Sequence, residues 1–142
     1  MSASHLKALV IDDQHSMRSI LLALLRKLNI TQVKEAENGE RAVEMLLSNA
    51  DKPDFILCDL YMDKGGGIDF INQMRRQDAL KILNIPVILL TGESDPMILN
   101  VGRQVGAAAI LQKPCSLPDL AKTIGGAVGF DLTPGSSLRA DA

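Results

Sequence analysis

Four short, largely apolar segments of this chain each end abruptly in a polar residue. They are residues 9–11, 55–58, 86–90 and 109–112, and they are followed in order by Asp12 with Asp13, Asp59, Thr91 and Lys113. A strand of a parallel sheet is buried on both faces and reads as a near-continuous apolar run. Because parallel strands end at the same edge, where open α/β sheets build their sites, the pattern predicts one polar site at one sheet edge.

The segments between these runs are predicted to be helical. The clearest amphipathic stripe consists of Met17, Ile20, Leu21, Leu24, Leu25 and Leu28. Asp95 before Pro96 predicts the start of a later helix, and Ser116 predicts the cap of the last one. With a short strand over residues 32–36, five strands alternate with five helices. This alternation predicts an α/β fold with a doubly wound five-stranded parallel sheet in the order 2-1-3-4-5.

Composition limits the classes of protein to which the chain can belong. Its 142 residues suit one domain, and 46% hydrophobic with 23% charged residues is ordinary for a globular protein. The net charge of −2, without a block of Lys or Arg, argues against nucleic-acid binding. Neither a signal sequence nor a membrane-spanning run is present, and Cys58 and Cys115 are expected to be free thiols. We therefore expect a cytoplasmic protein with no membrane span.

The polar residues at the strand ends suit phosphoryl chemistry. Asp12, Asp13 and Asp59 would form an oxygen-rich cluster, and Mg²⁺ prefers a few carboxylates together with water and phosphate oxygens. A carboxylate such as Asp59 can attack phosphorus and become an aspartyl phosphate. Lys113 would supply a positive charge to one phosphoryl oxygen, and the hydroxyl of Thr91 could donate a hydrogen bond to another.

The ordered set Asp12-Asp13, Asp59, Thr91 and Lys113-Pro114 resembles the receiver domain of response regulators. The resemblance covers roughly residues 6–128, so we expect a receiver domain over residues 1–130. A short tail over residues 131–142 would follow, without an output domain. The resemblance implies the flavodoxin-like receiver fold.

The resemblance also implies a role for each site residue. Asp59 would accept a phosphoryl group from a histidine kinase or a histidine phosphotransfer protein. Asp12 and Asp13, with Asp59 and the backbone carbonyl of Tyr61, would hold Mg²⁺. A stand-alone receiver would catalyse phosphotransfer to and from its own aspartate only. It would signal by binding a protein target through the face formed by its fourth helix, fifth strand and fifth helix. A cis peptide bond commonly joins the pair that corresponds to Lys113-Pro114.

Some positions depart from the family pattern. The usual proline four residues after the acceptor is Asp63, the aromatic three residues before the lysine is Ile110, and the frequent Phe after Lys-Pro is Cys115. Because Ile110 is a β-branched aliphatic residue with a stiff χ1, the conformational readout is expected to be muted. The residues flanking the path of a hydrolytic water would be Tyr61 and Glu93, and we expect Tyr61 to slow the loss of phosphate by shielding it.

Two other interpretations are open at this stage. The chain could be a receiver-like interaction module that works without phosphorylation, although the intact acidic set argues against this. It could also be a phosphatase with an aspartate nucleophile, but that family has Asp-x-Asp at the end of its first strand. Here the sequence is Asp12-Asp13-Gln14, and the candidate nucleophile follows the third strand. Chemotaxis, a phosphorelay shuttle and a phosphate sink all remain compatible pathways.

Overall fold

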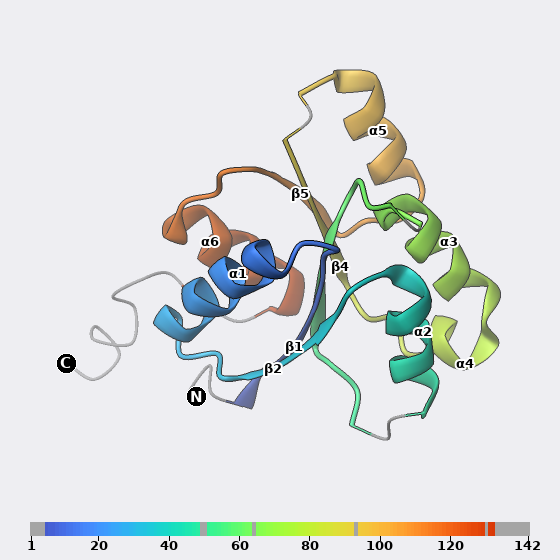
Figure 1. The fold of residues 1–142 in the computed structure, drawn as a ribbon, viewed down its shortest axis with the longest axis horizontal. Helices are drawn as coiled ribbons and strands as arrows, with labels where there is room; N and C mark the ends of the chain where they lie inside the picture. The colour runs from blue at the N-terminus through green and yellow to red at the C-terminus, as the bar shows by residue number, and fades with distance from the viewer. Residues whose placement is uncertain (1–4, 49–50, 64, 93, 130, 133–142) are drawn as a thin grey trace.

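A computed structural model describes residues 5–48, 51–63, 65–92, 94–129 and 131–132. Its five strands form one parallel sheet in the order β2-β1-β3-β4-β5, which confirms the predicted topology (Figure 1). The strands are β1 (Lys7–Ile11), β2 (Gln32–Ala36), β3 (Phe55–Asp59), β4 (Val87–Thr91) and β5 (Ala109–Gln112). Of the expected tail, all but the first two residues lie outside the described part of the chain.

Helices cover both faces of the sheet. They are α1 (His15–Lys27), α2 (Gly39–Ser48), α3 (Gly67–Arg76), α4 (Asp78–Lys81), α5 (Pro96–Gln104) and α6 (Leu117–Val128). In Figure 1, α1 and α6 lie on one side of the sheet, with α2 and α3 on the other. None of the described helices has the length and apolar character needed to cross a membrane.

The five predicted helices are present, and the described residues also contain a short sixth helix, α4. Helix α4 has only four residues, too few for an apolar period to be recognised in the sequence. Its Leu80 is 1% exposed and belongs to the apolar cluster beneath α2 and α3. The helices that the family pattern counts as fourth and fifth are therefore α5 and α6 here.

The two faces of the sheet supply two separate apolar clusters. Along each central strand, alternate side chains point to opposite faces, and both faces are buried. Val10, Leu57 and Ile88 pack toward α1 and α6, whereas Ile11, Ile56 and Leu89 pack toward α2 and α3. This double burial explains why the strands read as continuous apolar runs.

Local signals set several helix ends as predicted. The Oδ1 atom of Asp95 accepts a hydrogen bond from the backbone N–H of Met97 at 2.9 Å. The Oγ atom of Ser116 accepts one from the N–H of Asp119 at 3.1 Å. Asn29, with φ of 65°, follows the end of α1, where a left-handed residue commonly stops a helix. The caps at Asp95 and Ser116 fix the starts of α5 and α6, the two helices that flank β5.

Candidate functional site

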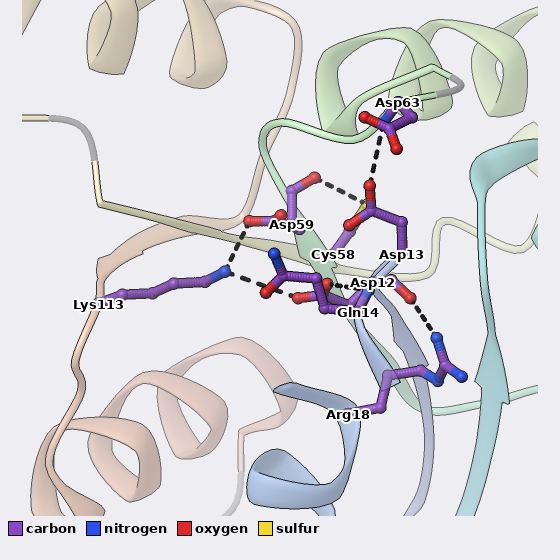
Figure 2. A network of polar contacts seen from close by, with 8 residues as sticks. All are labelled: Asp12, Asp13, Gln14, Arg18, Cys58, Asp59, Asp63 and Lys113. Atoms are coloured by element: carbon purple, nitrogen blue, oxygen red, sulfur yellow. Dashed lines mark hydrogen bonds and ion pairs between the residues drawn. The ribbon is translucent and has the colours of Figure 1, made fainter. Parts of the chain in front are cut away.

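The carboxyl ends of β1 and β3 bring the predicted acidic residues together. In the paired strands Ile11 lies opposite Cys58, so Asp12 and Asp59 occupy neighbouring positions at the sheet edge. One carboxylate oxygen from each of Asp12, Asp13 and Asp59 lies within 4.8 Å of the others. Figure 2 shows the three side chains close together at this sheet edge, and we call the space between them the crevice.

Lys113 extends into this crevice from the segment that follows β5. Its Nζ atom is 2.9 Å from Oδ1 of Asp59 and 3.6 Å from Oδ2 of Asp12 (Figure 2). The backbone N–H of Lys113 donates to the carbonyl of Thr91 at 2.8 Å, which ties the end of β5 to the end of β4. The Lys113-Pro114 peptide bond is cis, as the resemblance implied.

The other predicted site residues lie at the same edge. Thr91 is the last residue of β4 and is fully buried. It lies one position beyond Leu90, which pairs with Asp59. The side chain of Tyr61 is 55% exposed, two residues after Asp59. Glu93, expected beside the hydrolytic water, lies outside the described residues.

Asp12 carries the observation that most directly indicates a cation. The residue is 1% exposed, and its Oδ1 atom accepts a hydrogen bond from the backbone N–H of Gln14 at 2.9 Å. Within the described part of the chain, its Oδ2 atom is buried without a hydrogen-bond partner. The ammonium group of Lys113, 3.6 Å away, is beyond hydrogen-bond distance, and a buried polar atom in that state is costly and calls for a ligand. The side-chain atoms clustered here that could bind a metal ion are all carboxylate oxygens, so the residues fit Mg²⁺.

The electrostatics of Asp59 support the same conclusion. Burial raises the pKa of the Asp59 carboxyl above its ordinary value, and the charges of Asp12 and Asp13 add to this effect. The hydrogen bond and positive charge of Lys113 lower that pKa but do not cancel the increase. One ammonium group thus faces three carboxyl groups. A bound cation would favour the ionised form of Asp59, as Lys113 does.

Cys58 lies directly before Asp59 but is a poor candidate nucleophile. Burial, reinforced by the nearby charges of Asp59 and Asp12, raises the pKa of its thiol far above the ordinary value. Its Sγ atom donates a weak hydrogen bond to the backbone carbonyl of Asp59 at 3.5 Å. A thiol that stays protonated cannot attack as thiolate, so the carboxylate of Asp59 is the better nucleophile in the crevice.

Two contacts around the acidic pair have no signal in the sequence. Arg18 of α1 donates from Nη1 to the backbone carbonyl of Asp12 at 2.6 Å and from Nε to Oε1 of Glu35 at 3.0 Å. The backbone N–H of Asp63 donates to Oδ2 of Asp13 at 3.1 Å. The contacts with Asp12 and Asp13 each involve a backbone group, which every residue type except proline offers equally, whereas the contact between Arg18 and Glu35 joins two side chains.

The doubly wound parallel sheet with an acidic cluster at its carboxyl edge is the architecture of a receiver-type signalling domain, and comparison with known families agrees. The sequence model of the response regulator receiver domain matches residues 8–125. The chain therefore belongs to the response regulator receiver domain family. Members of this family are signalling proteins of two-component systems rather than classical enzymes, and they bind Mg²⁺ through acidic residues.

Relatives of known identity support the assignment. The chemotaxis protein CheY of Pseudomonas aeruginosa is 33% identical over 119 residues, which cover 84% of this chain and 93% of that protein. The transcriptional regulatory protein PdtaR of Mycobacterium tuberculosis is 32% identical over 118 residues. That match covers 83% of this chain but only 54% of PdtaR, so the chain spans about half of that regulator.

Solved structures show the same fold. The chemotaxis protein CheY4 of Vibrio cholerae has a TM-score of 0.75 at 29% identity, over 86% of this chain and 98% of that one. The signal receiver domain of a signal transduction histidine kinase from Syntrophus aciditrophicus has a TM-score of 0.75 at 28% identity, over 87% and 90% of the two chains. Receiver folds thus occur both in a chemotaxis protein and in a histidine kinase.

Proposed function

We propose that the chain is a response regulator receiver that accepts a phosphoryl group on Asp59. The donor would be a histidine kinase or a histidine phosphotransfer protein in the cytoplasm, and the reaction would require Mg²⁺. The observation that carries this proposal is the convergence of Asp12, Asp13 and Lys113 on the Asp59 carboxylate. Neither a solvated surface cluster nor a helix cap accounts for the buried Oδ2 atom of Asp12, which lies 3.6 Å from Nζ of Lys113 and has no hydrogen-bond partner among the described residues.

The side chains of Asp12, Asp13 and Asp59, with the backbone carbonyl of Tyr61, would hold the Mg²⁺ ion. A metal bound there supplies neutralisation of the negative charge that gathers on the phosphoryl oxygens. Arg18 would support the ligand set by holding the backbone carbonyl of Asp12.

In the proposed transfer, a carboxylate oxygen of Asp59 attacks the phosphorus of a phosphohistidine. The new phosphorus–oxygen bond forms as the phosphorus–nitrogen bond breaks, and the electron pair of the broken bond stays on the imidazole. Lys113 would hold one phosphoryl oxygen by its charge, and the hydroxyl of Thr91 would donate to another. Attack by water later returns Asp59 and free phosphate, so the chain acts only on its own aspartate.

The output would be a protein–protein contact through the face formed by α5, β5 and α6. Helix α5 exposes two large apolar side chains there, Met97 at 76% and Val101 at 42%. β5 joins this face to the crevice, because its last residue, Gln112, immediately precedes Lys113. A movement of Lys113 on phosphorylation would thus be transmitted through β5 to α5 and α6.

The direct test is incubation with a small acyl phosphate and Mg²⁺, followed by intact mass measurement near neutral pH. We expect the addition of one phosphoryl group, and no addition when a chelator removes the metal. Absence of labelling with Mg²⁺ present would favour the phosphorylation-independent interaction module. Rapid multiple turnover of a phosphate ester would instead favour the phosphatase.

Tyr61 is expected to slow the loss of the phosphoryl group. Hydrolysis needs a water in line with the bond between Asp59 and phosphorus, and positioning dominates this chemistry. A bulky side chain two residues after the acceptor can lie over that path. Tyr61→Asn and Tyr61→Ala should therefore both dephosphorylate severalfold faster than the parent when the labelled proteins are followed by mass. If both lose phosphate at the parent rate or more slowly, Tyr61 is not a shield.

Ile110 is expected to keep its side-chain conformation on activation. A Cβ atom added at Gly102 of α5 would lie 2.8 Å from Cδ1 of Ile110, so the isoleucine already packs closely on that helix. Its β-branched side chain also has a stiff χ1. When beryllium fluoride, a phosphoryl mimic, is added with Mg²⁺, methyl NMR signals should change more near Thr91 and α5 than at Ile110. A rotamer change of Ile110 as the largest response would contradict this prediction.

A further inference from the structure

Backbone hydrogen bonds hold the segment between β3 and α3 next to the acidic pair. The N–H of Leu60 donates to the carbonyl of Leu90 at 2.8 Å, and the N–H of Gly67 donates to the carbonyl of Leu60 at 3.1 Å. A Cβ atom at Gly66 would lie 2.2 Å from the Leu60 carbonyl oxygen, so the two ends of the segment meet in close contact. The described residues of this segment, 60–63 and 65–66, are therefore fixed in place at both ends beside the crevice.

Within this loop, the backbone N–H of Asp63 donates to Oδ2 of Asp13 at 3.1 Å. Figure 2 shows this contact joining the loop to the acidic pair at the mouth of the crevice. Asp12 is held in a similar way, because its Oδ1 atom accepts from the backbone N–H of Gln14. Each carboxylate of the pair thus has one oxygen oriented by a backbone amide.

We propose that the backbone N–H of Asp63 positions the Asp13 carboxylate for the cation before the cation arrives. This inference rests on the proposed function, because it assigns Asp13 to the metal site. A hydrogen bond from an amide to a carboxylate is charge-assisted, so it both orients Asp13 and offsets part of its repulsion with Asp12 and Asp59. Groups that orient metal ligands in this way commonly contribute strongly to metal affinity.

The residue at this position decides whether the contact can exist. Proline, which the family pattern usually has four residues after the acceptor, carries no N–H and cannot make this bond. Every other residue type can. The contact is made by the backbone of Asp63, whose side chain is exposed. Asp63 is therefore a positioning residue through its amide, and the role of its amide can be separated from that of its carboxylate.

The test compares Asp63→Pro with Asp63→Ala in direct titration with Mg²⁺ by calorimetry, without a phosphodonor. Both variants lack the carboxylate, but only Asp63→Ala retains the N–H. We expect Asp63→Pro to bind Mg²⁺ about tenfold more weakly than Asp63→Ala. With an acyl phosphate, Asp63→Pro should need more Mg²⁺ for half-maximal labelling yet approach the rate of Asp63→Ala when Mg²⁺ is saturating. A merely unfolded or distorted variant would not recover in this way.

A spectroscopic readout makes the test independent of the proline. In metal-free protein the amide proton of Asp63 should resonate downfield and exchange slowly, and Asp13→Ala should remove both signatures. Equal Mg²⁺ affinity of Asp63→Pro and Asp63→Ala, or an Asp63 amide that is unaffected by Asp13→Ala, would overturn the inference. Labelling of Asp59 in the parent protein alongside either result would leave the proposed function standing. A parent that neither binds Mg²⁺ nor is labelled would overturn the proposed function as well.

Discussion

Asp59→Asn is expected to abolish phosphoryl labelling by an acyl phosphate and Mg²⁺. The substitution preserves the shape of the side chain but replaces an ionised oxygen nucleophile with a neutral amide. Loss of a nucleophile commonly reduces a reaction by several orders of magnitude, the largest effect expected for any residue of this site. The variant also loses the ion pair of 2.9 Å between Asp59 and Lys113, so its folding should be checked by circular dichroism.

Asp69→Asn is the matched control for this experiment. Asp69 lies in the first turn of α3 and is exposed, and it has no role in the proposed chemistry. Intact mass should show labelling of this variant at the parent rate. Labelling of Asp59→Asn at a rate close to that of Asp69→Asn would show that another residue is the acceptor.

Asp13→Asn should have opposite effects on metal binding and on stability without metal. Removing one ligand charge should weaken Mg²⁺ binding by at least about tenfold. In chelator-treated buffer the same variant should be more stable than the parent, because Asp13 repels the neighbouring carboxylates. The side-chain oxygen of Asn can still accept the hydrogen bond from the backbone N–H of Asp63. The change is therefore mainly one of charge.

The expected stability gain of Asp13→Asn in metal-free buffer should depend on pH. The pKa of Asp59 is raised in the folded protein, chiefly by burial and then by its acidic neighbours, so the folded state binds this proton more tightly than the unfolded chain. Proton binding by Asp59 therefore adds to the free energy of unfolding at low pH, and this contribution is lost as the pH rises through the folded pKa of Asp59. Asp13→Asn removes one cause of that shift. The gain in the free energy of unfolding of Asp13→Asn over the parent should therefore be largest at neutral pH and should shrink in acid.

Urea unfolding of the parent and of Asp13→Asn, with chelator and with Mg²⁺, measures both effects. A ligand that binds only the folded state stabilises it by an amount that rises with the logarithm of its affinity, so Mg²⁺ should raise the parent midpoint more than that of the variant. Asp69→Asn should respond to Mg²⁺ as the parent does. If Asp13→Asn binds Mg²⁺ as tightly as the parent, Asp13 is not a ligand.

The alternation of apolar runs with amphipathic segments was sufficient to predict the sheet, its order and the edge that carries the site. This succeeded because burial on both faces leaves a continuous apolar signal in each central strand. Parallel strands also place their carboxyl ends at one edge. Asp12, Asp13, Asp59 and Lys113 could therefore be expected near one another from sequence alone. Helix α4 could not be predicted, because a four-residue helix shows no period.

Only the tertiary structure decided how the acidic pair is held. The Arg18 contact with the Asp12 carbonyl and the Asp63 contact with Asp13 both use a backbone group, which every residue type except proline supplies, so the sequence does not single these contacts out. The contact between Asp63 and Asp13 joins residues 50 positions apart. It depends on where the loop after β3 closes over the end of β1. Likewise, only the packing decides that Oδ2 of Asp12 is buried without a hydrogen-bond partner among the described residues, because the fold determines which neighbours lie within reach.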